Sequence, residues 1–170
     1  MAKDSSHGRF CWFDLMTTDP EGGMHFYTSV IPWSTEQWEG SATPYHMWKT
    51  DRGPIGGVTE LPEKLRSEGV PSHWLAHVEV AEIDESVRRV SALGGRIEKE
   101  PAKIPNAGTF AIISDPQGAV LSLYQNSSDS DQSEGKPKPG DFSWHELATT
   151  DYEAAWEFYR GLFDWEQIEA

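Results

Sequence analysis

The sequence of 170 residues contains a single cysteine, Cys11. Internal disulfide bonds and cysteine clusters that bind zinc are therefore excluded. The sequence also has no run of about 18 apolar residues, which a membrane span needs, and its first ten residues lack the apolar core of a signal peptide. We therefore expect a cytoplasmic protein that has no membrane partner.

Basic residues are scarce, because 14 Lys and Arg stand against 28 Asp and Glu, and the formal net charge is -14. Such a chain repels a phosphate backbone, so we expect no nucleic-acid partner. The acidic excess either steers a cationic ligand or forms a solvated surface, and both interpretations stay open. P-loop, dinucleotide-binding and Ser-His-Asp motifs are also absent. Aromatic residues, by contrast, are plentiful, and the eight Trp residues need packing partners or a ligand.

The most prominent feature present is a repeat. A shift of 132 places GRFCWFDLMTTDPEGGMHFY, which starts at Gly8, over GDFSWHELATTDYEAAWEFY, which starts at Gly140. The segment 126–140 between the copies, NSSDSDQSEGKPKPG, cannot bury apolar area and is predicted to be a linker. We therefore expect one module at 8–125 and the opening strand and helix of a second, incomplete module at 141–170.

Within the first module, the order of strand, helix and three strands occurs twice. RFCWFDLM alternates as a strand does, and TTDP then supplies an N-cap and a first-turn proline for a helix that ends near Val30. SHWLAHVEV opens the second half, and EIDESVRRVSALGG is an amphipathic helix with a glycine C-cap. The pattern predicts an α+β fold in which paired βαβββ half-modules form a cupped mixed sheet with helices on its outer face.

This double βαβββ order, with FY in the first helix, ALGG closing the second and DPQGAVLSLYQ at the end, resembles the vicinal oxygen chelate superfamily. That superfamily contains glyoxalase I, bleomycin resistance proteins and extradiol dioxygenases. More narrowly, WFDLMTTD, PSHWLAHVEV and DPQGAVLSLY are similar to the tandem-module glyoxalase-like proteins. The resemblance implies either a binder of small molecules or an enzyme of the lyase, dioxygenase or hydroxylase type, and it leaves open whether the chain is catalytic.

In metal-dependent members of the superfamily, each half supplies a His, Gln or Glu from its first and last strands to a divalent ion. The resemblance puts Trp12, Leu75 and Ser122 at three of the four equivalent positions, and the fourth falls near Gly57. The side chains of Trp, Gly and Leu provide no donor for a divalent ion. We therefore expect no metal cofactor. The alternative is a divalent metal ion held by relocated ligands such as His77.

Strand alternation places a set of polar and aromatic candidates on the sheet face away from the helices. His77 and Asp14 are the candidate catalytic groups, His77 as a general base or hydrogen-bond donor and Asp14 as a carboxylate that binds a cationic ligand. The predicted ligand-binding residues are Trp12, Asp14, His77, Glu79, Ser122, Tyr124 and Trp48. The alternatives are that His77 is only structural, that Asp14 pairs with Arg52 or Arg96, and that part of the aromatic set is core.

Three functions remain open at this point. The first is a metal-free binder of the bleomycin-resistance kind, in which aromatic rings hold a small-molecule ligand. The second is a glyoxalase- or dioxygenase-type enzyme, and the third is a scaffold used for pairing. The fragment 141–170 cannot bury its own apolar face, so we expect it to pack on another module or to support self-association.

Overall fold

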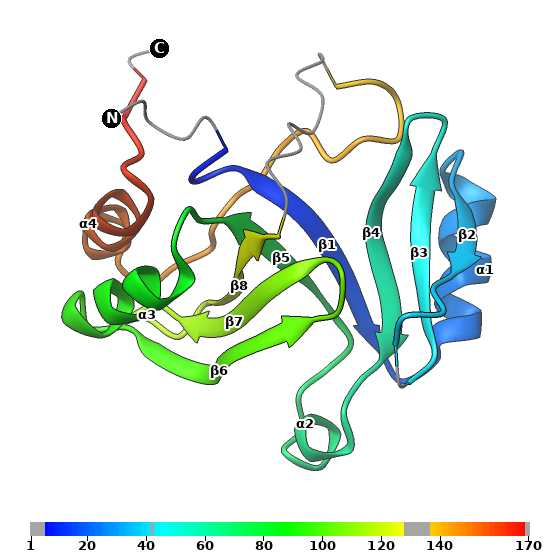
Figure 1. The fold of residues 1–170 in the computed structure, drawn as a ribbon, viewed down its shortest axis with the longest axis horizontal. Helices are drawn as coiled ribbons and strands as arrows, with labels where there is room; N and C mark the ends of the chain where they lie inside the picture. The colour runs from blue at the N-terminus through cyan, green and yellow to red at the C-terminus, as the bar shows by residue number, and fades with distance from the viewer. Residues whose placement is uncertain (1–5, 42, 128–136, 169–170) are drawn as a thin grey trace. The chain divides into compact units, whose positions relative to one another are not determined.

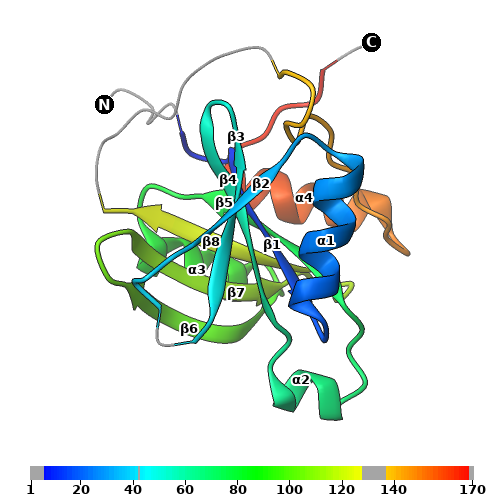
Figure 2. The same ribbon diagram turned by 90° about the vertical axis from the view of Figure 1, so that its right-hand side faces the viewer.

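The computed structural model describes residues 6–41, 43–127 and 137–168 (Figure 1, Figure 2). The chain divides into two compact units. We call Trp12–Ala76 together with Glu134–Trp144 the β1–β4 unit. Met1–Cys11, His77–Ser133 and His145–Ala170 form the β5–β8 unit. The late segment that resembles the start of a module is therefore shared between the two units.

The β1–β4 unit contains most of the first βαβββ half. Its elements are β1 (Phe10–Thr17, which begins in the other unit), α1 (Pro20–Val30), β2 (Ser34–Gln37), β3 (Tyr45–Thr50), β4 (Gly53–Glu60) and α2 (Glu63–Ser67). The strands lie in the order β2, β3, β4, β1; β1 runs parallel to β4 and the other neighbours are antiparallel. The short helix α2 follows β4 and was not expected from the sequence.

Helix α1 begins as the TTDP segment predicts. The Asp19 carboxylate accepts a hydrogen bond from the Gly22 backbone N–H at 2.9 Å, and Pro20 occupies the first turn. Met24 and Tyr27 of this helix pack against a buried cluster that includes Leu15, Trp48, Val58 and Trp33. One face of α1 therefore covers one face of this half-sheet.

Aromatic rings dominate the core of the β1–β4 unit. Three indole N–H groups donate to partners there, Trp48 to the Gly57 carbonyl, Trp74 to the Tyr27 hydroxyl and Trp33 to the Gly140 carbonyl, at 2.7, 2.9 and 2.7 Å. Buried indoles need such partners because an unpaired N–H costs free energy. Phe142 from the late segment joins the cluster and stacks on Phe13, with ring centroids 3.8 Å apart.

The β5–β8 unit contains the second βαβββ half and one additional helix. Its elements are β5 (His73–Glu79, which begins in the other unit), α3 (Ile83–Ala92), β6 (Arg96–Ile104), β7 (Gly108–Ser114), β8 (Val120–Asn126) and α4 (Tyr152–Phe163). The strand order is β5, β8, β7, β6, with β5 parallel to β8 and the other pairs antiparallel. The α+β class with two βαβββ halves and mixed pairing is thus confirmed.

Helices α3 and α4 lie side by side (Figure 1) and share one apolar core. This core contains Val90 of α3, Phe158 and Leu162 of α4, and residues of β5, β7 and β8. The Trp165 indole N–H also donates to the Gly8 carbonyl at 2.8 Å. The late segment therefore supplies a substantial part of the core of this unit.

One element expected in the late segment is missing. Residues 137–151 form no strand in the structure, although their sequence repeats that of β1. A strand requires hydrogen-bonding neighbours; β1 pairs with β4, whereas residues 137–151 pair with no strand in the described part of the chain. The expected opening strand is therefore wrong for this chain and the expected helix is present. The boundaries expected for the modules and the linker stay a prediction, and residues 128–136 of the linker lie outside the described residues.

Candidate active site on the first half-sheet

Three side chains of the β1–β4 unit form one hydrogen-bond network. The Trp12 indole N–H lies 3.0 Å from Oδ1 of Asp14 and 2.8 Å from the Tyr45 hydroxyl oxygen. The Tyr45 hydroxyl in turn donates to Oδ1 of Asp14 at 2.7 Å. All three side chains are half-buried. We call this set the Trp12/Asp14/Tyr45 network.

Strand register explains why these residues meet. Trp12 and Asp14 alternate on β1 and point away from the core that holds Leu15. Asp14 of β1 pairs with Gly57 of β4, and β3 pairs with the other edge of β4. The β3 side chains on the same face therefore lie across Gly57 from Asp14. A Cβ on Gly57 would lie 2.0 Å from the Tyr45 hydroxyl and 2.6 Å from Oδ1 of Asp14. The network therefore depends on the absence of a side chain at position 57.

The network keeps a proton donor and a carboxylate in contact. Burial, followed by the negative charge of Asp14, raises the pKa of the Tyr45 phenol well above its ordinary value. Tyr45 therefore stays protonated over the usual pH range and acts as a donor. A carboxylate held by two donors at the N–H edge of an indole ring suits a ligand that carries aromatic surface and positive charge.

The donor set at the superfamily's metal positions does not fit a divalent ion. Trp12, at one of the equivalent positions, and Gly57, near another, lie at this network, and neither residue has a side-chain oxygen or imidazole nitrogen. Leu75 is buried and apolar. In the part of the chain that the structure describes, no three His, Cys, Asp or Glu side chains gather as metal ligands do. We therefore assign no chemical role to a metal ion at these positions.

Trp48 lies elsewhere than predicted. Its ring is fully buried in the aromatic core with Tyr27, Trp33 and Trp74, on the α1 face of the sheet. A side chain without exposed surface cannot contact a ligand, so the prediction that Trp48 binds one is wrong. Alternation on β3 places Tyr45, three residues earlier, on the opposite face, where its hydroxyl meets Asp14.

The remaining predicted site residues belong to the β5–β8 unit, where they form two pairs across neighbouring strands. His77 of β5 pairs with Ser122 of β8, and Glu79 pairs with Tyr124. His77 is buried, and Ser122 is fully buried with its hydroxyl 3.2 Å from the Ala111 carbonyl. Ser122 is thus engaged inside the unit, and its predicted ligand contact is wrong for the same reason as for Trp48.

Tyr124 is half-buried and its hydroxyl donates to the Ala107 carbonyl at 2.8 Å. Burial raises the pKa of this phenol, with Cys11 and Glu79 adding to the shift. His77, Glu79 and Tyr124 therefore stay candidates for ligand contact on one face of β5 and β8.

Cys11 is held in its neutral form. Burial, with a further contribution from the negative charge of Glu79, raises the pKa of the Cys11 thiol from 9.0 to about 12. Sγ of Cys11 lies 3.5 Å from the carbonyl oxygen of His77, and the thiol donates a hydrogen bond to it. Since the thiolate is the reactive form, this cysteine is no nucleophile at neutral pH.

We predict that Ellman's reagent modifies Cys11 at pH 8 far more slowly in the native protein than in urea, followed by absorbance. The same shift has a stability consequence. The folded pKa exceeds the unfolded value of 9.0, so the stabilisation linked to this thiol is full below pH 9 and is lost as the pH rises toward 12. A Cys11→Ala variant is the control and should not react. Native and unfolded chains that react at equal rates would contradict the assignment.

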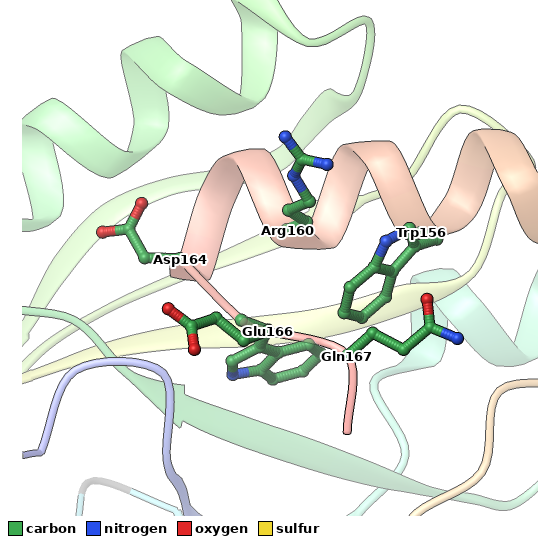
Figure 3. Close-up of a pocket in the computed structure, with 6 residues that line it drawn as sticks. Trp156, Arg160, Asp164, Glu166 and Gln167 are labelled. Carbon is green, nitrogen blue, oxygen red and sulfur yellow. The ribbon is translucent and has the colours of Figure 1, made fainter. Parts of the chain in front are cut away.

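A separate hollow lies along α4 in the β5–β8 unit (Figure 3). It has a volume of about 590 Å³ and is lined by Trp156, Arg160, Asp164, Trp165, Glu166 and Gln167. Its wall is mostly exposed, and Arg160 pairs with Glu157 on the same helix. The hollow contains none of the residues that the sequence predicted for the site.

Comparison with known proteins settles the family. The profile of the Glyoxalase/Bleomycin resistance protein/Dioxygenase superfamily matches residues 9–123. The chain belongs to this superfamily. The matched residues run from the start of β1 into β8 and include the whole Trp12/Asp14/Tyr45 network.

Individual relatives support the same assignment. A Mycobacterium bovis protein named "Putative glyoxylase CFP32" is 35% identical over 119 residues, which cover 69% of this chain and 44% of the relative. The Anthracycline biosynthesis protein DauV of Streptomyces sp. is 26% identical over 164 residues, covering 90% of this chain and 59% of the relative. The chain thus spans about half the length of these relatives.

Among solved structures, the Mn(II)-bound glyoxalase from Novosphingobium aromaticivorans matches with a TM-score of 0.60 at 15% identity. The match covers 93% of this chain and 52% of that chain. At this identity the likeness shows a shared glyoxalase-type fold.

Proposed function

We propose that this member of the superfamily binds a small molecule over the Trp12/Asp14/Tyr45 network and does so without the divalent metal of its metal-dependent relatives. The observation that carries the proposal is that Trp12, Asp14 and Tyr45 form one half-buried hydrogen-bond network, and that its Trp12 occupies a position where the resemblance leads us to expect a metal ligand. Membership of a superfamily that includes bleomycin resistance proteins supports binding as the activity.

The chemistry of the network favours a ligand with an aromatic ring and a positive charge. The Trp12 ring provides an apolar face, and Asp14 provides negative charge next to it. One relative is named for the biosynthesis of anthracyclines, which are polycyclic aromatic compounds. We therefore choose aromatic amines, anthracyclines among them, as the first compounds to test.

The test measures bound metal and ligand-induced stabilisation on the same protein. Elemental analysis of protein purified without chelators should find transition metals only well below one per chain. A compound at 100 times its Kd should stabilise the native state by about 2.7 kcal/mol and so raise Tm by several degrees. Asp14→Asn should abolish the shift for aromatic amines, because it removes the charge that pairs with the amine, whereas Asp84→Asn on the exposed start of α3 should leave it intact.

Two outcomes would contradict the proposal. A stoichiometric metal that is lost in the His77→Ala variant would contradict metal-free binding and favour the alternative, a metal-dependent lyase or dioxygenase with relocated ligands. Absence of any Tm shift across aromatic and cationic compounds would contradict the proposal that the protein binds a small molecule of these classes.

A further inference from the structure

We propose that the outer face of α1 is a docking surface for an amphipathic helix of the α3 type, supplied by the second half of a further glyoxalase-like module. We define the α1 face as Phe26, Ser29 and Val30. The inference concerns a protein interface and does not depend on the ligand proposed above.

The internal repeat identifies what the α1 face is built to contact. The shift of 132 residues places α1 on α4, with Phe26 on Phe158, Ser29 on Gly161 and Val30 on Leu162. Both helices start from an aspartate cap whose carboxylate accepts the N–H three residues later, at 2.9 and 3.0 Å. Because the two helices begin at equivalent residues of the repeat, these positions lie on the same face of each helix.

In α4, that face is covered by α3. Phe158 and Leu162 are buried in the core that also holds Val90 of α3. A Cβ on Gly161 would lie 3.1 Å from Leu93, which places the α4 backbone directly against the end of α3. A Cβ on Gly95, just after α3, would lie 2.8 Å from the Phe158 ring. Small residues on each side therefore permit the close approach of these two elements.

In α1, the same face is exposed. Phe26 is 57% exposed and Val30 is 62% exposed. These two large apolar side chains lie one helical turn apart, and such a pair usually packs against another element. The equivalent of Gly161 is Ser29, which is also small. The α1 face therefore has the apolar pair and the small residue that α4 uses against α3.

The C-terminal end of α1 also fits an α3-type helix as the docking partner. Arg89 of α3 donates to the Gly161 carbonyl near the end of α4 and lies 3.3 Å from Asp164. Helix α1 has no basic residue in its last turn, so the partial negative charge of its C-terminus has no cation from its own sequence. An α3-type helix would bring an arginine to the Ser29 carbonyl.

A further module fits this surface better than a second copy of the chain. In the described structure α3 is covered by α4, so a second copy has no uncovered α3 to offer. The relatives are about twice as long as the matched part, 44% and 59% of their lengths being covered, which leaves room for a second half-module with its own α3 equivalent. Trp144, at 79% exposure, and Leu147 are further apolar side chains of the repeat that lack the cover their counterparts have in β1.

The test uses the full chain and a helix-stabilised, fluorescently labelled peptide of residues 81–97 as the probe. Anisotropy should show saturable binding to the wild type. A protein with Phe26→Asp and Val30→Asp should bind at least about tenfold more weakly, because two apolar side chains no longer become buried. Val120→Asp is the matched control, since Val120 is an apolar residue that is 52% exposed on β8. A peptide with Val90→Asp and Leu93→Asp should not bind.

Thermal melts of the variants should match the wild type, because the changed residues are already exposed. Failure of the wild type to bind the peptide, or equal binding by the double variant, would overturn the proposal. Sedimentation velocity provides the remaining comparison. Self-association of the wild type that the double variant abolishes would identify a second copy as the occupant, and the proposal would then be wrong.

Discussion

The Trp48→Ala variant should lose about 3–5 kcal/mol of its free energy of unfolding, the range for truncating a fully buried large aromatic side chain. Trp48 has no exposed surface, and the rings of Tyr27, Trp33 and Trp74 have centroids 5.7, 5.4 and 6.1 Å from its own. The variant also leaves the Gly57 carbonyl without the indole N–H that lies 2.7 Å from it. Urea denaturation followed by circular dichroism measures the loss.

Trp144→Ala provides the matched control. Trp144 is 79% exposed, so its truncation should change the free energy of unfolding by no more than about 0.5 kcal/mol. The comparison is sharp because the chemical change is the same in both variants. Equal losses at the two positions would contradict the assignment of Trp48 to the core.

The Asp115→Ala variant should be destabilised by about 3 kcal/mol or more. Asp115 is fully buried, and its Oδ1 accepts the backbone N–H groups of Gln117 and Ala119 at 2.9 and 2.8 Å. Its Oδ2 accepts the Tyr159 hydroxyl of α4 at 3.0 Å. Removing the carboxylate leaves these donors without an acceptor, and each buried unsatisfied group costs about 1–3 kcal/mol. The loss is measured by urea denaturation at pH 7.

Tyr159→Phe separates the two roles of Asp115. It removes only the bond from α4 and should cost about 1 kcal/mol, because the turn after β7 keeps both of its backbone bonds. Burial and the charge of Asp115 raise the pKa of the Tyr159 phenol, so the hydroxyl remains a donor at neutral pH. If Asp115→Ala were no worse than Tyr159→Phe, the carboxylate would not support the turn.

Much of the fold follows from local patterns in the sequence. Alternation located the eight strands, and the TTD segment located the start of α1, because an aspartate at that position satisfies a helix N–H. Helix α2 was missed, since the five residues EKLRS are too few to show a helical period. The strand expected in the late segment was wrong because strand formation depends on a neighbour and not on the pattern alone.

The candidate site was predicted less completely. Trp12 and Asp14 could be placed on the face away from the core because they alternate on a strand whose opposite face is clearly apolar. The hydrogen bonds of Tyr45 to Trp12 and Asp14 could not be predicted, because they depend on the register of β3 against β4. Trp48 was misplaced for a related reason. In YHMWKT both faces carry aromatic or amphipathic residues, so alternation cannot decide which one is buried.

Gly57 participates on both sides of its strand, since its carbonyl accepts the buried Trp48 indole while its bare Cα leaves space for the Tyr45 hydroxyl. Any residue other than glycine at position 57 would place its Cβ 2.0 Å from that hydroxyl and 2.6 Å from Oδ1 of Asp14. The Tyr45 ring would then have to move, and the hydrogen bond from its hydroxyl to Asp14 would be lost. One glycine therefore links the packing of the aromatic core on one face of β4 to the geometry of the polar network on the other.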